Sequence, residues 1–72
     1  MNYAPLLRKL QAAHFANGRT ILVNQFQNYS KKAGRTVTKI VLSEKKDGHL
    51  QKIFETWRTH EAVKFLADEL NK

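Results

Sequence analysis

The chain has 72 residues, of which 13 are Lys or Arg, 6 are Asp or Glu and none is Cys, and its formal net charge is +7. A chain this short buries only about 60% of the surface that it exposes when unfolded, so we expect a single domain over residues 1–72 with one small core. A hydrophobic fraction of 42% is too high for a disordered tail, and the aliphatic runs are far shorter than the ~20 residues of a membrane span. The absence of Cys excludes disulfides and thiolate metal sites, and the N-terminus lacks the pattern of a signal peptide. These features predict a soluble, cytoplasmic protein.

Helical periodicity marks both ends of the chain. Pro5 suits a first helical turn, and an apolar stripe at helical spacing then continues to Asn17-Gly18, which predicts a helix over about residues 4–16. Near the C-terminus, Thr59 can cap a second helix with Glu61 in its first turn. The apolar stripe of this second helix consists of Val63, Leu66, Ala67 and Leu70.

The region between the helices reads as strands. Residues 36–43 and 50–57 are rich in Val, Ile, Thr and aromatic residues, and they flank Asp47-Gly48, which is typical of a hairpin turn. Large aromatic residues supply much of the burial in a small domain, so Phe54 and Trp57 are assigned to the core or to helix packing.

Residues 20–33 fit two structures. As a helix, this segment would place Leu22, Phe26, Tyr29 and Ala33 on one face, with Gly34 as the cap. Its many poor helix formers and its lack of an acidic residue near the start favour a strand instead. The predicted fold is therefore an α+β domain of order α-β-β-β-α, a three-stranded antiparallel meander packed by N- and C-terminal helices. The alternative order, α-α-β-β-α, would resemble a small winged-helix domain with residues 36–57 as the wing.

No residues have the spacing of a catalytic or metal-binding group. The six acidic residues all fall within residues 44–72, and His14, His49 and His60 form no His-x-x-His or Glu-x-x-His pair. The glycines are single turn residues, not a loop that could cradle a phosphate. We therefore expect a non-enzymatic protein that binds no metal and no other cofactor.

The positive charge is unevenly distributed along the chain. Residues 1–43 contain seven basic and no acidic residues, whereas residues 44–72 contain six of each, so the entire net charge belongs to the N-terminal part. Clustered Lys and Arg bind polyanions because they release condensed counterions. Such an asymmetry, with an isoelectric point of about 10.1, is typical of nucleic-acid-binding domains. The charge pattern predicts a small basic protein that binds DNA or RNA.

The densest part of this charge lies at residues 31–35, where three cations surround a predicted turn between two strands. A basic turn of this kind can straddle a phosphate backbone. The preceding residues 24–29 interleave four amides with two aromatic rings, which can face bases, although the simpler interpretation is an edge strand with a hydrated face. The residues predicted to contact phosphate, in a patch centred on residues 31–39, are Arg19, Lys31, Lys32, Arg35 and Lys39.

Two known arrangements resemble this order of elements. Helix, three antiparallel strands and helix is also the order of the double-stranded-RNA-binding domain, whose last helix opens with a lysine cluster. Here that position reads Thr59-His60-Glu61-Ala62-Val63-Lys64, with an acidic residue where positive charge is needed. Residues 54–62 are loosely similar to the strand-to-helix passage of the arm-binding domain of phage-type integrases, which lays a sheet into the major groove. Both resemblances imply nucleic-acid binding, and neither assigns the chain to a family.

A second hypothesis is a protein–protein adaptor or inhibitor. Apolar residues fall on both faces of the predicted sheet, and exposed apolar patches mark interaction sites. A core this small also gains stability from association. Such a module would dock on an acidic protein surface or form a homodimer through a sheet edge. The choice between DNA, RNA and a protein partner stays open at this point.

Overall fold

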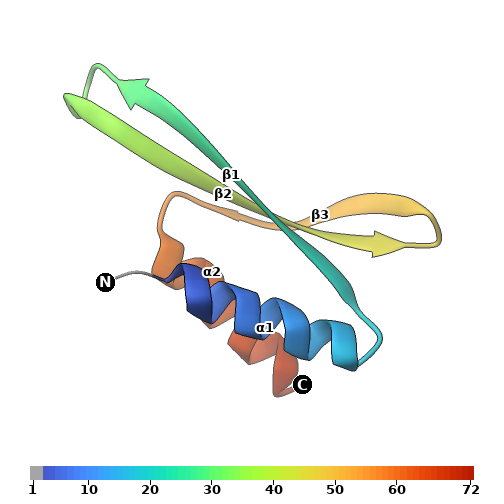
Figure 1. Cartoon of the computed structure of the whole chain (residues 1–72). Helices are drawn as coiled ribbons and strands as arrows, with labels where there is room; N and C mark the ends of the chain where they lie inside the picture. The colour runs from blue at the N-terminus through green and yellow to red at the C-terminus, as the bar shows by residue number, and fades with distance from the viewer. Residues whose placement is uncertain (1–2) are drawn as a thin grey trace.

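The structure is a computed structural model that describes residues 3–72. Its elements in chain order are α1 (Ala4–Ala16), β1 (Thr20–Ser30), β2 (Arg35–Lys46), β3 (His49–Thr56) and α2 (Thr59–Leu70). The strands form one antiparallel sheet in the order β1-β2-β3, and both helices lie against the same face of it (Figure 1). The predicted α-β-β-β-α fold is confirmed. Residues 20–30 form a strand, so the winged-helix alternative is wrong.

The core lies between the sheet and the helices. Strand periodicity places Ile21, Ile40 and Leu42 on the face that the helices cover, where they meet Leu7 of α1 and Leu66 of α2. At the edge of this core, Phe54 of β3 and Phe65 of α2 stack with ring centroids 4.5 Å apart. Phe54 therefore packs against a helix as expected. Within the described residues 3–72, no helix has the length and apolar character needed to cross a membrane.

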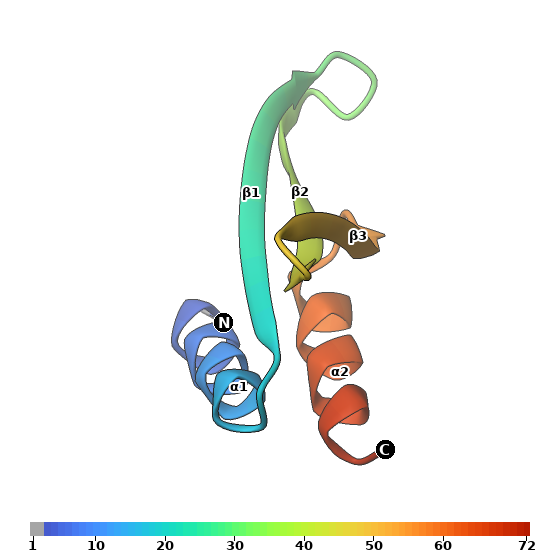
Figure 2. The same cartoon turned by 90° about the vertical axis from the view of Figure 1, so that its right-hand side faces the viewer.

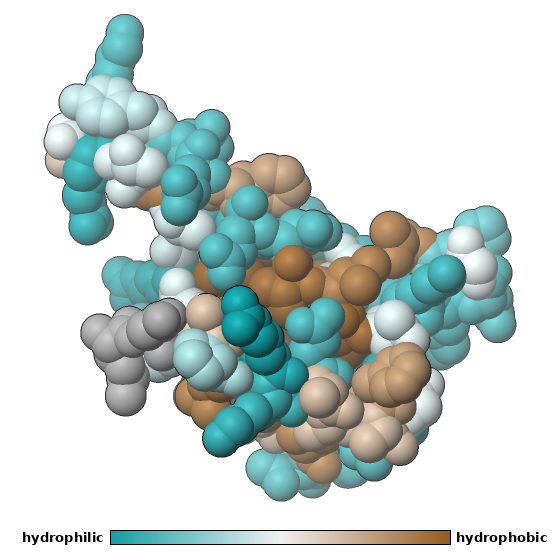
Figure 3. All heavy atoms as spheres, in the orientation of Figure 1, coloured by the Kyte–Doolittle hydropathy of each residue, from teal (hydrophilic) through white to brown (hydrophobic). Residues whose placement is uncertain are grey.

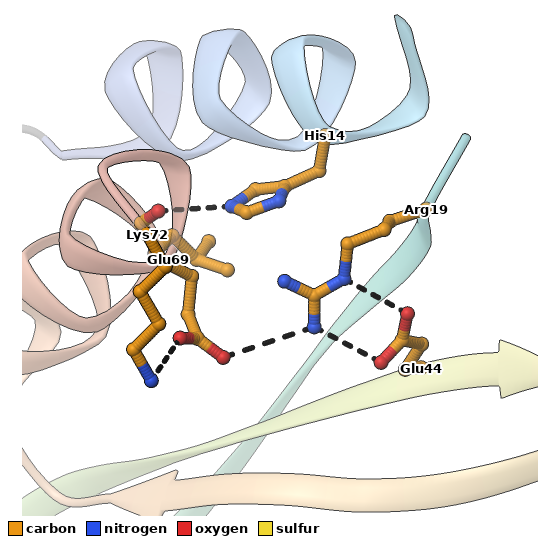
Figure 4. Close-up of polar contacts among 6 residues, drawn as sticks. His14, Arg19, Glu44, Glu69 and Lys72 are labelled. Atoms are coloured by element: carbon orange, nitrogen blue, oxygen red, sulfur yellow. Dashed lines mark hydrogen bonds and ion pairs between the residues drawn. The ribbon is translucent and has the colours of Figure 1, made fainter. Parts of the chain in front are cut away.

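The two helices are joined by a buried polar contact. His14, on the last turn of α1, is only 1% exposed, and its Nε2 lies 2.9 Å from the carbonyl oxygen of Leu66 in α2 (Figure 4). Because a carbonyl can only accept, the Nε2–H group is the donor. The bond satisfies a polar group that would otherwise be costly to bury. His14 is thus a structural residue of the helix pair.

A β-bulge in β3 explains the imperfect alternation of its sequence. Leu42 lies opposite Phe54 while the next residue of β2 lies opposite Lys52, so Ile53 is the extra residue. Ile53 and Phe54 consequently both pack against the core. Lys52 and Glu55 come to share the opposite face, where the ammonium group of Lys52 donates to a Glu55 carboxylate oxygen at 2.7 Å.

The hairpin formed by β1 and β2 is longer than the rest of the sheet. β3 pairs with β2 only from Ile40 to Lys46, whereas β1 pairs along β2 as far as the turn. The residues beyond Ile40 form a two-stranded projection, residues 26–39, which we call the arm. Figures 1 and 2 show it extending past the ends of both helices. Its five paired rows, from Phe26–Lys39 to Ser30–Arg35, span about 13 Å along the strands.

Candidate nucleic-acid interface

The end of the arm is a four-residue turn held by Ser30. The Ser30 hydroxyl oxygen accepts a hydrogen bond from the Ala33 N–H at 3.2 Å, and the Ser30 carbonyl accepts one from the Gly34 N–H at 2.8 Å. Gly34 has a φ of 66°, a left-handed conformation that favours glycine. These contacts use local backbone and Ser30 groups alone, so the charged side chains of the turn take no part in forming it.

Three of the predicted phosphate-binding residues are brought together here, and we call residues 31–35 the arm tip. Lys31, Lys32 and Arg35 are all exposed, and none of them forms an ion pair within the described part of the chain. The whole arm contains four basic and no acidic residues. Figure 3 shows its end as a hydrophilic projection set apart from the body of the molecule. The arm tip is therefore a local, uncompensated charge of +3.

Lys39 lies at the base of the arm, about 13 Å along β2 from Arg35. Its ammonium group forms an ion pair with Glu55 of β3 and lies 5.7 Å from the centroid of the Trp57 ring. Hydrogen bonds from Lys39, and then from Lys52, hold the pKa of Glu55 below its ordinary value. Lys39 therefore has a carboxylate partner, unlike the arm tip, but it shares that carboxylate with Lys52, so the three side chains together keep a charge of +1.

Arg19 lies at the opposite end of β1, about 35 Å along the strand from the arm tip. Its guanidinium group donates to both carboxylate oxygens of Glu44, at 2.9 and 3.0 Å, and lies 3.8 Å from Glu69 of α2 (Figure 4). The hydrogen bonds from Arg19 lower the pKa of Glu44, and the contact with Lys72 lowers that of Glu69. Arg19 joins the start of β1 to β2 and α2, and the structure does not bring it together with the other predicted residues.

A groove beside the arm contains two residues that the sequence did not single out as a site. Arm residues between Asn28 and Val37 line one side, Trp57 and Arg58 line the other, and the volume is about 550 Å³. Trp57 is 58% exposed and is not a core residue, because β3 ends at Thr56 and Trp57 follows the last paired row. The groove places an aromatic ring and the Arg58 cation near the arm.

The faces of the arm carry exposed amides and aromatic rings. Phe26 is 51% exposed and Tyr29 is 67% exposed, and the four amides of residues 24–28 are exposed as well. β1 is an edge strand, as the simpler interpretation of this amide-rich segment predicted. Amides can hydrogen-bond to base edges and rings can stack on bases.

The start of α2 differs from this arm in its chemistry. Glu61, in the first helical turn, accepts a hydrogen bond from the Thr56 hydroxyl at 2.7 Å. Thr59 is the first residue of the helix and not its cap, so the predicted capping role of Thr59 is wrong. Arg58 stands at the N-cap position, and its side chain makes no capping hydrogen bond. The lysine cluster of double-stranded-RNA-binding domains therefore has no equivalent at this helix end.

Comparison with known proteins adds no homologue. No family model matches the chain, and no curated protein or solved structure is significantly similar to it. Among residues 3–72, no group of three His, Asp or Glu side chains is close enough to hold a metal ion. The geometry and charge of the arm are therefore the features from which a function can be inferred.

Proposed function

We propose that this protein binds nucleic acid through the arm, with duplex DNA as the form that the arm fits best. The observation that carries the proposal is the arm tip, where Lys31, Lys32 and Arg35 project together with no carboxylate partner among residues 3–72. Lys and Arg side chains that are free of internal ion pairs can exchange their counterions for phosphates. The proposal includes a non-enzymatic role in the cytoplasm, as expected from the sequence.

The dimensions of the arm support a groove-binding mode. The major groove of B-form DNA is about 12 Å wide and 8.5 Å deep, and it admits a two-stranded β-ribbon. The arm is such a ribbon, and its paired length of about 13 Å exceeds the depth of the groove. In this mode the cations of the arm tip contact phosphates, while Asn28 and neighbouring amides face base edges.

Duplex RNA fits the same arm less well. The major groove of A-form RNA is deep and too narrow for side chains to read, so duplex RNA is bound across its minor groove. The helix end that makes a basic contact in double-stranded-RNA-binding domains is here occupied by Glu61, which is bonded to Thr56. This difference favours DNA among the two duplexes.

The test is a fluorescence-anisotropy titration at low salt with labelled duplex DNA, single-stranded DNA and duplex RNA of matched sequence. We expect the duplex DNA to bind most tightly. The variant K31Q/K32Q/R35Q should lose more than about tenfold in affinity, because three phosphate contacts are removed.

A matched control distinguishes the effect of the arm tip on binding from the effect of the protein's net charge. The variant K45Q/K46Q/K64Q removes the same number of charges from three exposed lysines at the other hairpin turn and on α2. This control should retain near wild-type affinity. Equal losses in the two variants, or no binding of any of the three nucleic acids, would overturn the proposal.

A further inference from the structure

β1 is an open edge of unusual length and neutrality. It has 11 residues, Thr20 to Ser30, without a charged residue, Pro or Gly, and it pairs with β2 on one side only. Edge strands in monomeric proteins normally carry charges, Pro or bulges that prevent pairing with another chain. The other edge strand, β3, has these features: a bulge, and both Lys52 and Glu55.

The two hairpin turns establish which backbone groups of β1 face this open edge. The two-residue turn at Asp47 and Gly48 has positive φ at both positions, 54° and 79°, so the pair that closes it, Lys46 and His49, is hydrogen-bonded. Successive residues of a strand direct their N–H and C=O groups to opposite sides. Even-numbered residues of β2 therefore bond to β3, and odd-numbered residues bond to β1.

The same alternation applies to β1. Each odd-numbered residue of β2 lies opposite an even-numbered residue of β1, as Arg35 lies opposite Ser30. The odd-numbered residues of β1 must then direct their backbone groups away from the sheet. A hydrogen bond agrees with this assignment: the Gln11 side chain donates to the Ile21 carbonyl oxygen at 2.7 Å. With the Ile21 carbonyl bonded to α1, the residues whose N–H and C=O groups both remain open are Val23, Gln25, Gln27 and Tyr29.

A twofold axis can pair the open backbone groups of these four residues with those of a second copy. If a second copy pairs antiparallel with β1 about an axis through Phe26, Val23 lies opposite Tyr29 of the second copy and Gln25 opposite its Gln27. All the backbone groups that these four residues direct to the open edge are then paired in both strands. An axis through Gln25 would instead require Ile21, which Gln11 already occupies. We infer that the chain forms a homodimer through β1, with a continuous six-stranded sheet.

A groove at the edge supports this register. α1 and β1 enclose a space of about 410 Å³, lined by Leu7, Arg8 and Gln11 on the helix and by Val23 and Gln25 on the strand. In the inferred dimer, Tyr29 of the second copy lies opposite Val23 and on the same sheet face, so its ring extends into this groove. Tyr29, 67% exposed in the single chain, becomes buried.

The other face of the new sheet joins like residues. Phe26, 51% exposed, meets Phe26 of the second copy at the axis, and Asn24 lies opposite Asn28. Aromatic pairs and amide pairs across strands are favourable, and the strand carries no charge to repel its copy. Each chain has a net charge of +7, so raised salt should strengthen the dimer. In this dimer the β1 side of the arm is paired with the second copy, so the arm can enter a DNA groove as a two-stranded ribbon only in the monomer, and dimerisation competes with DNA binding. Raised salt should favour the dimer and low salt the DNA-bound monomer, so the two proposals fail independently.

Sedimentation equilibrium without nucleic acid, at low and high salt, tests the association. We expect a concentration-dependent dimer for the full chain and a monomer for Gln27→Pro, whose lost N–H faces the open edge and is not part of the hairpin. Circular dichroism should show that this variant stays folded. A monomer at every protein and salt concentration overturns the inference.

Disulfide cross-linking tests the register, because the chain contains no Cys. In the inferred dimer the two Phe26 positions form a non-hydrogen-bonded pair with Cα atoms about 4.5 Å apart, which is within the range of a disulfide. Phe26→Cys should cross-link under mild oxidation. Leu50→Cys, at an exposed position on the other edge strand, is the matched control and should not. Equal cross-linking at the two positions, or preferential cross-linking at Leu50, contradicts the proposed edge.

Discussion

Neutralising the arm tip should change how binding to duplex DNA depends on salt. Each phosphate that a protein cation contacts contributes about 0.9 to the slope of log affinity against log salt concentration. The structure indicates how many cations are available to contact phosphates. Within residues 3–72, Lys31, Lys32 and Arg35 have no ion-pair partner, whereas Arg19 and Lys39 are paired with carboxylates. The variant K31Q/K32Q/R35Q should therefore lose about 2.7 from the slope.

Between about 50 and 200 mM salt, a slope of 2.7 corresponds to roughly a 40-fold change in affinity. Anisotropy titrations at four or five salt concentrations measure this slope for the wild type, the arm-tip variant and the control K45Q/K46Q/K64Q. The control should keep the wild-type slope. An unchanged slope for the arm-tip variant would contradict the proposal, since the three cations would then contact no phosphate. A slope lowered by Arg19→Gln as much as by one arm-tip substitution would also contradict it.

Three further predictions concern stability. Leu42→Ala, at a fully buried position, should lower the free energy of unfolding by about 3 kcal/mol, as measured by urea denaturation. Leu50→Ala, which shortens an exposed side chain, should change it by less than about 0.5 kcal/mol. Arg19 holds the pKa of Glu44 below its ordinary 4.5, so the stability from this pair is present above pH 4.5 and is lost as the pH falls below it. Glu44→Gln should therefore lower the melting temperature at neutral pH, and its difference from the wild type should shrink in acid. Gly34→Ala should lower the free energy of unfolding by about 1 kcal/mol, because φ at this position is 66° and alanine is strained there. Backbone strain is the whole effect, since a Cβ at this position would meet no atom within 4 Å. A melting temperature equal to that of the wild type would contradict the left-handed turn.

The fold was predictable from the sequence because its signals are local. Asp47-Gly48 encodes its turn through two positive φ angles, and the helical stripes at either end encode apolar faces that must pack on a core. For residues 20–30, weak helix propensity was enough to favour the strand that is observed. The bulge at Ile53 was visible only as an irregular alternation, since a bulge is defined by the partner strand.

The candidate site was predictable only where its residues are consecutive. Lys31, Lys32 and Arg35 are close in sequence and stay together at one turn. Arg19 and Lys39 meet Glu44 and Glu55 across strands, and a charge count along the chain cannot reveal such pairs. The exposure of Trp57 likewise depends on where β3 stops relative to β2, which no local pattern encodes.

The bulge in β3 also limits how large an assembly can become. A sheet that grows by adding molecules side by side needs two edges that accept a neighbour. Once two copies join through β1, both outer edges are β3, where the extra residue Ile53 interrupts the regular spacing of backbone groups. Lys52 and Glu55 place a charged pair on the same short strand. In the inferred homodimer, growth would therefore stop at two molecules, and an amide-rich strand that could otherwise start a fibre would lie at the centre of a finite assembly.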